Sequence, residues 1–427
     1  MREPCRVPVA SLKWQNQIHR QSASRQKKFA THSQTPTWWS SMLERIRGNT
    51  SVVAAVAITA VLYGAVIAGR LAYHNWDPAF FIVAGHAFCD ESSTPPGLTI
   101  FTRYGYDGLF YYRLALDPLT NERIEYGITI DNPAYRQQRI LYPVLARIAA
   151  LGANSWVPWS MIMVNYLAVC GLAFSAARFA ELFAMPAIYG LVIPFFPGVL
   201  LGLDRDLADP LAISLMVFSL YLLHSRRITF AACMLALAVL TRETVILLAA
   251  ALFLHSGWRA LRRQSSWTES VRLAIPLAAY AAWQLWIFAR WGIFPAAAAS
   301  GSVLGFPLDA AGILLIEALH SALGLHPFLL VELLFLGAMV LLAAIVFIRS
   351  AVDPGVKLAW LLYLALAAFL SRAVWVEDWA FMRGCEELIV LGFMIVIGVR
   401  ARRLMPIVIA PTLAIWLALA ARTMIAQ

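Results

Sequence analysis

Apolar residues in this chain form long, nearly uninterrupted runs that are separated by short polar segments. About 20 consecutive apolar residues suffice to cross a bilayer as a helix, so such runs predict transmembrane segments. We expect an all-α polytopic membrane protein with about eleven transmembrane segments, at residues 50–69, 156–177, 186–203, 207–223, 228–240, 245–254, 273–289, 328–348, 358–370, 388–399 and 406–421.

The apolar stretch 230–255 is interrupted by the charged residues Arg242 and Glu243. It is either one long helix or two short segments that meet at this pair. With a break, the basic residues around 226–227, 259–272, 349–357 and 400–403 all fall on the same side as the basic N-terminal residues. Cytoplasmic loops carry an excess of Lys and Arg, so we expect the broken helix, which proteins tolerate where it lines an enclosed cavity.

The composition agrees with a membrane protein, since 61% of the residues are hydrophobic, 14% are charged and the mean hydropathy is +0.69. The net charge of +10 does not indicate nucleic-acid binding, because Lys and Arg mark the cytoplasmic ends of membrane segments. Residues 1–49 are basic and rich in Ser, Gln and Thr, which predicts a disordered cytoplasmic tail.

A long polar segment, residues 70–139, follows the first apolar run and is expected outside the cytoplasm. It contains a predicted helix at 106–116, and a second helix at 140–151 is expected at the membrane interface. With this topology four polar clusters lie on the face opposite the tail, and this convergence of charges suggests a functional site. The clusters are YDGLFYYRLALDP with DNPAYRQQRILYP, LDRDLADP, TRET, and WVEDWAFMRGCEE.

Each cluster also has a purely structural explanation. Asp107 is compatible with a turn or a helix cap, and so are Asp206 and Asp209. The aromatic residues around Asp107 are compatible with an interfacial belt, and Arg242 with Glu243 is compatible with a structural ion pair. Two cysteines, Cys89 and Cys385, are expected on the oxidising side, where a disulfide between them is an open alternative.

The outer loop with Asp107 is followed by YRQQRILYPVLARI, then by DLADPLAISL and VLTRETVILL. This order resembles the GT-C superfamily of integral-membrane glycosyltransferases, in particular the bacterial members distantly similar to the GPI-type mannosyltransferases. The resemblance covers residues 50–254, and the C-terminal half by general layout. It implies a cytoplasmic tail (1–49), a GT-C-like catalytic membrane module (50–255, with outer loop 70–139) and a C-terminal membrane module (256–427).

The resemblance implies an inverting enzyme that transfers a hexose, mannose-like, from a polyprenyl-phosphate sugar to an acceptor glycan, lipid or protein outside the cytoplasm. The attacking hydroxyl must lose its proton, for which Asp107 is the candidate general base. The departing phosphate needs cationic partners, and the candidates are Arg242, which we favour, Arg136, Arg139 and Arg383. Further candidates for substrate binding are Tyr106, Tyr111, Asp206, Asp209, Glu243, Asp378 and Trp379.

The family has a paired acidic dipeptide where this chain has the single Asp107, so a divalent metal is an open alternative that the sequence does not indicate, and no other cofactor is expected. The expected partners are the sugar-carrying lipid and the bilayer, and the expected location is the bacterial inner (cytoplasmic) membrane. A lipid-linked-sugar flippase or secondary transporter is the main alternative, because broken helices and intramembrane charges suit it equally. A flippase or transporter is expected to have polar residues that continue through the bilayer to the inner face, or an inverted repeat. The sequence has neither feature. A polymerase or ligase of surface glycans is a third class.

Overall fold

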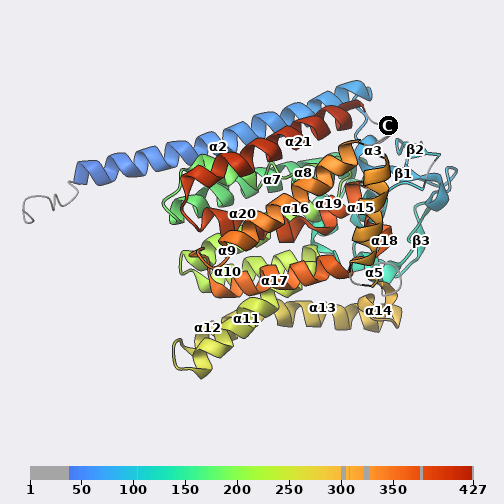
Figure 1. Cartoon of the computed structure of the whole chain (residues 1–427). Coiled ribbons are helices and arrows are strands. Elements are labelled where there is room, and N and C mark those ends of the chain that lie inside the picture. Colours follow the sequence, from blue (N-terminus) through green and yellow to red (C-terminus); the bar gives the residue numbers. More distant parts are fainter. Residues whose placement is uncertain are drawn as a thin grey trace, which may run out of the picture. The chain divides into compact units, whose positions relative to one another are not determined.

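The structure of the chain is a computed structural model that describes residues 38–102, 104–299, 304–306, 308–321, 327–375 and 378–425. It is an all-α protein, 74% helical (Figure 1). Its internal contacts divide it into residues 1–50 and residues 51–427, and the account below concerns the second unit. Residues 1–37 of the predicted tail lie outside the described residues, and helix α2 (Trp38–Tyr73) begins within that tail.

The described residues contain six helical segments that are long and apolar enough to cross a membrane. They are Thr50–Tyr73, Asn154–Leu182, Glu243–Leu261, Trp267–Trp291, Phe328–Val346 and Arg402–Met424. Three shorter apolar helices are α9 (Asp209–His224), α10 (Ile228–Thr241) and α17 (Pro354–Phe369). A multi-pass membrane protein is therefore supported, while the count of eleven crossings stays a prediction.

Two predicted segments are interrupted or short. The run 186–203 forms η3 (Ala187–Val192) and α8 (Pro197–Asp204), because Pro194 and Pro197 interrupt a continuous helix. The run 388–399 forms α20 (Glu386–Ile397), which is buried along its whole length. The remaining helices are η2 (Asn154–Trp156), α7 (Val157–Leu182), α11 (Ile246–Leu261), α12 (Trp267–Leu273), α13 (Ile275–Trp291), α14 (Pro295–Ala299), α15 (Asp309–Ser321), α16 (Pro327–Val346), α18 (Arg372–Trp375), α19 (Asp378–Gly384), η5 (Arg402–Leu404) and α21 (Met405–Ile425).

The predicted break in the stretch 230–255 is present. Helix α10 ends at Thr241, and Arg242 has an extended backbone with φ −150° and ψ 123°. A short 3-10 turn, η4 (Glu243–Val245), then leads into α11. The chain therefore reverses at Arg242, and α10 and α11 both place one end beside this residue.

Four helices, α9, α10, α11 and α17, connect the two ends of the second unit. α9 packs on α10, and α11 packs on α17 (Figure 1). At 1.5 Å per residue, helices of 14 to 16 residues span about 21–24 Å. One end of this group holds Asp209, Arg242 and Leu370, and the other holds His224, Arg259 and Asp353.

The outer segment 70–139 folds over the first of these ends. It contains α3 (Ala79–Ile82), β1 (Ala84–Gly85) paired in parallel with β2 (Ile100–Phe101), η1 (His86–Phe88), α4 (Gly108–Leu116), the antiparallel pair β3 (Ile124–Glu125) and β4 (Ile128–Thr129), and α5 (Pro133–Gln137). The predicted helices 106–116 and 140–151 correspond to α4 and α6 (Leu141–Ala149).

Gly108 allows α4 to begin directly against the loop between α8 and α9. A Cβ atom at this position would lie 2.3 Å from the carbonyl oxygen of Arg205 and 2.8 Å from that of Ile82. No side chain fits there, and all residues of α4 are buried. The close approach places Asp107, which precedes the glycine, at the junction of the outer segment and the helices.

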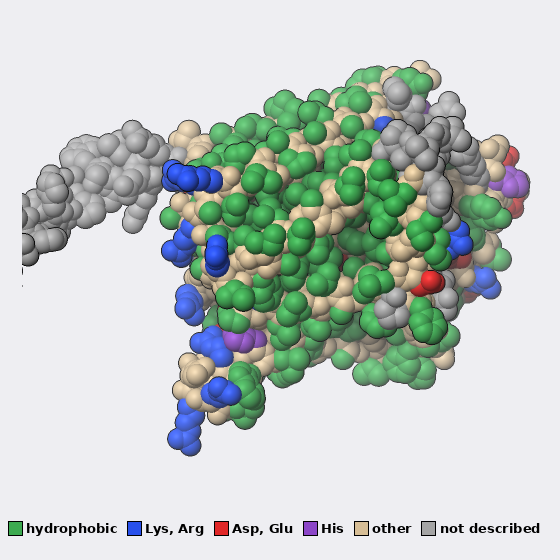
Figure 2. Space-filling view, viewed as in Figure 1, with side chains coloured by type: hydrophobic (Ala, Val, Ile, Leu, Met, Phe, Trp, Pro, Cys, Tyr) green, Lys and Arg blue, Asp and Glu red, His purple; other side chains and the backbone are tan. Residues whose placement is uncertain are grey.

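Charged side chains of the second unit are unevenly distributed between its two ends. In Figure 2, Lys and Arg gather at the end where α11 meets α12, while the visible Asp and Glu lie at the opposite end. This distribution agrees with the topology expected from the loops, in which the basic end is cytoplasmic.

A cysteine at Thr268, which is exposed at the basic end, is predicted to stay unlabelled by a membrane-impermeant thiol reagent in intact cells. A cysteine at the exposed Asn121, in the outer segment, is predicted to be labelled. Both variants are made in a chain whose native cysteines are replaced. Labelling of the Thr268 position without cell lysis would contradict the topology.

Candidate functional site

A cavity of about 490 Å³ lies where the outer segment meets the ends of α10, α17 and α19. All four arginines proposed from the sequence line it, together with Asp107, Tyr106 and Glu243. The remaining lining residues are Phe88, Tyr104, Gly105, Phe110, Asp131, Tyr135, Thr244, Leu366, Leu370, Val374, Ala380 and Gly384. Segments more than 270 residues apart in the sequence therefore meet here, as the hydrogen bond between Arg383 and the Tyr106 hydroxyl shows.

Asp107 occupies the position before α4, but its side chain makes no capping hydrogen bond to that helix. Instead Nη1 of Arg136 donates to its Oδ1 at 2.8 Å, and Nη2 of Arg383 lies 3.7 Å from its Oδ2. Burial by itself raises the pKa of Asp107, but Arg136, Arg383 and Arg139 outweigh it and hold this pKa below its ordinary value. Asp107 is thus an ionised carboxylate in a cavity, and the helix-cap explanation does not apply.

Arg383 reaches the cavity from α19 and has one free donor. Its Nη1 donates to the Tyr106 hydroxyl at 3.0 Å, and its Nη2 donates to Oδ2 of Asp209 at 3.2 Å. Its Nε is buried and has no hydrogen-bond partner. A buried, unpaired N–H on a cation is a ready donor for an anion that enters the cavity.

Arg136 reaches the cavity from α5 and holds two carboxylates at once. It forms a two-pronged contact with Asp131, at 2.9 Å from Nε and 2.8 Å from Nη2, while Nη1 binds Asp107. Its guanidinium lies 4.3 Å from the centre of the Phe110 ring. The ring and Asp131 fix the direction in which Arg136 presents its charge to Asp107.

Arg139 is fully engaged in joining the outer segment to the helix break. Its Nε and Nη2 both bind the Glu243 carboxylate, at 2.7 and 2.5 Å. Its remaining donors bind the hydroxyls of Tyr111 and Tyr135, both at 2.9 Å. This arrangement makes Arg139 a residue that positions Glu243 and Tyr111, with little capacity left for a ligand.

Arg242, the arginine favoured from the sequence, is ion-paired with three buried carboxylates, although its Nε makes no hydrogen bond. Its Nη1 lies 2.8 Å from Asp209 and 3.2 Å from Glu386, and its Nε lies 3.3 Å from Glu387. Its Nη2 donates to the backbone carbonyl of Arg383 at 2.9 Å. The three carboxylates are at most 1% exposed, so this group forms the closed floor of the cavity.

Aliphatic side chains also line the cavity. They are Leu366 and Leu370, at the end of α17, and Val374, from α18. The cavity therefore combines cations, a carboxylate and aliphatic side chains.

Nine of the twelve proposed site residues belong to this cavity or its floor. Tyr111 and Asp209 lie beneath it and contact Arg139 and Arg383, respectively. Asp206 does not reach it, because its carboxylate accepts from the Tyr142 hydroxyl at 3.4 Å in a separate buried group. The side chains of Asp378 and Trp379 lie outside the described residues.

The sequence did not single out Asp131, Tyr135, Glu386 or Glu387 as site residues. Asp131 and Tyr135 belong to DNPAYRQQR, where the arginines drew attention, and the two glutamates end the cluster WVEDWAFMRGCEE. Cys89 and Cys385 are both free cysteines, so no disulfide joins them. Within the described residues no three His, Cys, Asp or Glu side chains group as metal ligands.

No known protein family matches the chain, and no curated protein is significantly similar to it in sequence. The proposals below therefore rest on the geometry of the site and on the sequence.

Arg242→Met is predicted to destabilise the protein by about 3–5 kcal/mol, because it leaves Asp209, Glu386 and Glu387 buried without their cation. The free energy of unfolding in detergent measures this loss. Arg136→Met is the control: its partners Asp107 and Asp131 are 28% and 31% exposed, so its expected cost is about 1 kcal/mol or less. Equal losses in the two variants would contradict the assignment of Arg242 to the floor.

Asp107→Asn is predicted to lower the unfolding midpoint at pH 7 and to lose this effect in acid. A carboxylate whose pKa is depressed in the folded protein stabilises it above the ordinary Asp pKa, of about 3.9, and this stabilisation disappears as the pH falls through the folded-state value. The difference between wild type and variant should therefore shrink below about pH 4. Asp117→Asn, at the other end of α4, is the control. A difference that grows in acid would show that Asp107 has a raised pKa.

Proposed function

We propose that this protein is an integral-membrane glycosyltransferase that transfers a hexose, more specifically a mannose-like sugar, from a polyprenyl-phosphate donor to an acceptor outside the cytoplasm. The observation that carries the proposal is the cavity in which Asp107 lies between Arg136 and Arg383 and which aliphatic side chains also line. The finer topology, with eleven crossings and the GT-C-like module at 50–255, is part of the same proposal.

The chemistry of such a transfer matches the groups in the cavity. The acceptor hydroxyl attacks the anomeric carbon and gives its proton to the Asp107 carboxylate, while the bond from that carbon to the phosphate oxygen breaks. The leaving group departs as an ionised lipid phosphate and needs no proton. Arg383 and Arg136 are then the cations that stabilise the growing negative charge. Attack from the side opposite the phosphate inverts the configuration of the sugar.

The donor phosphate also changes the state of Asp107. Without substrate, Asp107 is bound to Arg136 and lies near Arg383, so its low pKa makes it a weak base. A phosphate that takes over these two guanidinium groups weakens their hold on Asp107 and returns its pKa toward the ordinary value. Asp131 keeps Arg136 in place during this exchange. The base is thus strengthened when the donor is bound.

The aliphatic side chains of the cavity suit the lipid part of the donor. Leu366, Leu370 and Val374 lie at the end of α17 and in α18, where an isoprenoid chain reaches the cavity from the membrane. The nucleotide-sugar alternative needs a cytoplasmic phosphate-binding loop or an acidic metal motif. The inner loops of this chain are short, basic and poor in Asp.

A flippase or transporter fits the site less well. The floor of the cavity is closed by Arg242 and its three carboxylates, and the interior of α9, α10 and α11 beyond it carries no charged residue until His255. These helices thus carry no row of charged side chains from this cavity to the basic end, whereas transport of a charged lipid head favours one.

Asp107→Asn is predicted to reduce transfer by about 10²–10⁴-fold, the usual cost of losing a general base. Donor binding should persist, because the arginines remain. Asp117→Asn, on the same helix but outside the cavity, should retain activity. Activity of the Asp107 variant within a few-fold of wild type would remove Asp107 from the mechanism.

Purified protein is predicted to use a polyprenyl-phosphate hexose and to leave UDP- and GDP-sugars unused when no auxiliary synthase is added. The measurement offers the radiolabelled donors in parallel, with heat-inactivated membrane extracts as the acceptor source, so that the extract adds no active synthase. Efficient transfer from a nucleotide sugar alone would rule out the proposed donor class.

A further inference from the structure

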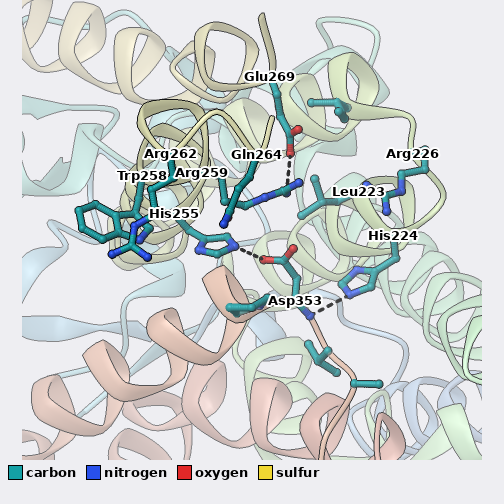
Figure 3. A pocket seen from close by; sticks show the side chains of 14 residues that line it. Leu223, His224, Arg226, His255, Trp258, Arg259, Arg262, Gln264, Glu269 and Asp353 are labelled. Carbon is teal, nitrogen blue, oxygen red and sulfur yellow. Dashed lines mark hydrogen bonds and ion pairs between the residues drawn. The ribbon is translucent and has the colours of Figure 1, made fainter. Parts of the chain in front are cut away.

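A second cavity, of about 590 Å³, lies at the basic end of the second unit (Figure 3). It is formed where α9 and α11 end and where α10 and α17 begin. Since each of these helices has its other end near the first cavity, about 21–24 Å of helix separates the two. Two helices begin and two end here, so their dipoles offset each other and the side chains determine the charge of the cavity.

The acidic residues of this cavity are already engaged. Asp353 accepts from the backbone N–H of Gly355 at 2.7 Å and so caps α17, while its own N–H donates to Nε2 of His224 at 3.4 Å. Glu269 lies 3.6 Å from Arg259. Figure 3 shows the contact of Glu269 with Arg259 and the contacts of Asp353 with His224 and His255, whose Nε2 lies 4.0 Å from Oδ1 of Asp353. Neither carboxylate is paired with Arg226 or Arg262.

Two arginines of the cavity are free to bind an anion. Within the described residues Arg226 and Arg262 make no ion pair, and Arg262 stacks on the Trp258 ring with its guanidinium 4.3 Å from the ring centre. The stacking directs the planar guanidinium without using its N–H donors. Such a fork matches the geometry of phosphate oxygens.

The rim of the cavity is apolar and exposed. Leu254 and Leu261, on α11, are 59% and 67% exposed, and Trp258 between them is 54% exposed. Exposed Leu and Trp beside arginines at a helix end are typical of the membrane interface, where tryptophan rings lie at the level of the lipid headgroups. A ligand held here therefore has its charge in the cavity and its apolar part along α11.

We propose that this cavity binds the phosphate of an anionic phospholipid headgroup in the cytoplasmic leaflet, with Arg226 and Arg262 as the phosphate ligands. The chemistry is that of a phosphate ester, and basic pockets between membrane helices on this side are suited to it. The site is distinct from the cavity around Asp107, and it does not depend on the function proposed for that cavity.

The test uses the full chain in neutral detergent and measures the unfolding midpoint as phosphatidylglycerol, phosphatidylcholine or glycerol 3-phosphate is added. We expect a saturable rise with phosphatidylglycerol and a much smaller rise with phosphatidylcholine. The double variant Arg226→Gln/Arg262→Gln should weaken the apparent affinity for phosphatidylglycerol about tenfold or more. The control Arg402→Gln/Arg403→Gln removes the same charge from exposed positions outside the cavity and should change the affinity less than twofold.

An equal loss of affinity for phosphatidylglycerol in the two double variants would overturn the site. It would show that the lipid is attracted by the total charge of the basic end and not by this cavity. Stabilisation by phosphatidylcholine as strong as by phosphatidylglycerol would overturn it as well. Glycerol 3-phosphate that binds as tightly as the lipid would support the phosphate site and overturn the lipid as its source. The single variant Arg262→Gln, at an exposed position after α11, provides the same comparison if the double variant fails to fold, and a normal affinity in it would contradict the role of Arg262.

Discussion

The guanidinium of Arg242 lies among the carboxylates of Asp209, Glu386 and Glu387, and most of the site depends on this group. None of these charges is tolerated at such depth in an apolar protein unless it is paired. Pairing them joins the ends of α9, α10 and α20 at one place. The extended backbone at Arg242 follows from the same need, because it lets the side chain reach its partners while α10 ends and α11 begins.

The outer segment is attached to this charged floor by further paired groups. Arg139 binds Glu243, and Arg383 binds both Asp209 and Tyr106. Arg139 therefore connects the outer segment to the helix break, and Arg383 connects α19 to the outer segment and to the start of α9. What remains open above the floor is a cavity lined by Asp107, by Arg136, which holds Asp107 and Asp131, and by Arg383, whose Nε has no hydrogen-bond partner.

Several features of this arrangement follow from the sequence. The break at Arg242 and the gathering of polar clusters at one end follow from the distribution of Lys and Arg among the loops, which is a property of the whole chain. The helices α4 and α6, which begin at Gly108 and Leu141, follow from the local pattern of apolar and polar residues. The sequence does not show which arginines are paired with carboxylates, because the pairing depends on residues far away in the chain. Glu386, a partner of Arg242, is 144 residues from it. The sequence favours Arg242 as the phosphate ligand, but three buried carboxylates offset its charge, so we propose Arg383 and Arg136 in its place.

Asp206 illustrates a different limit. It lies in the same short loop as Asp209, yet its backbone has φ 47° and its carboxylate points to Tyr142, while Asp209 begins α9 beneath the cavity. Residue type and spacing do not distinguish two such aspartates, since their different partners become visible only in the fold. The segment 186–203 is similar, because Pro194 and Pro197 turn an apolar run of spanning length into two short helices.

The most direct measurement of the central claim is an experimental structure of the protein with a polyprenyl-phosphate hexose bound. The account predicts the phosphate within hydrogen-bonding distance of Arg383 and Arg136, the isoprenoid chain along Leu366 and Leu370, and the Asp107 carboxylate released from Arg136 and facing the anomeric carbon. A donor phosphate located elsewhere, with the contact between Asp107 and Arg136 intact, would contradict it.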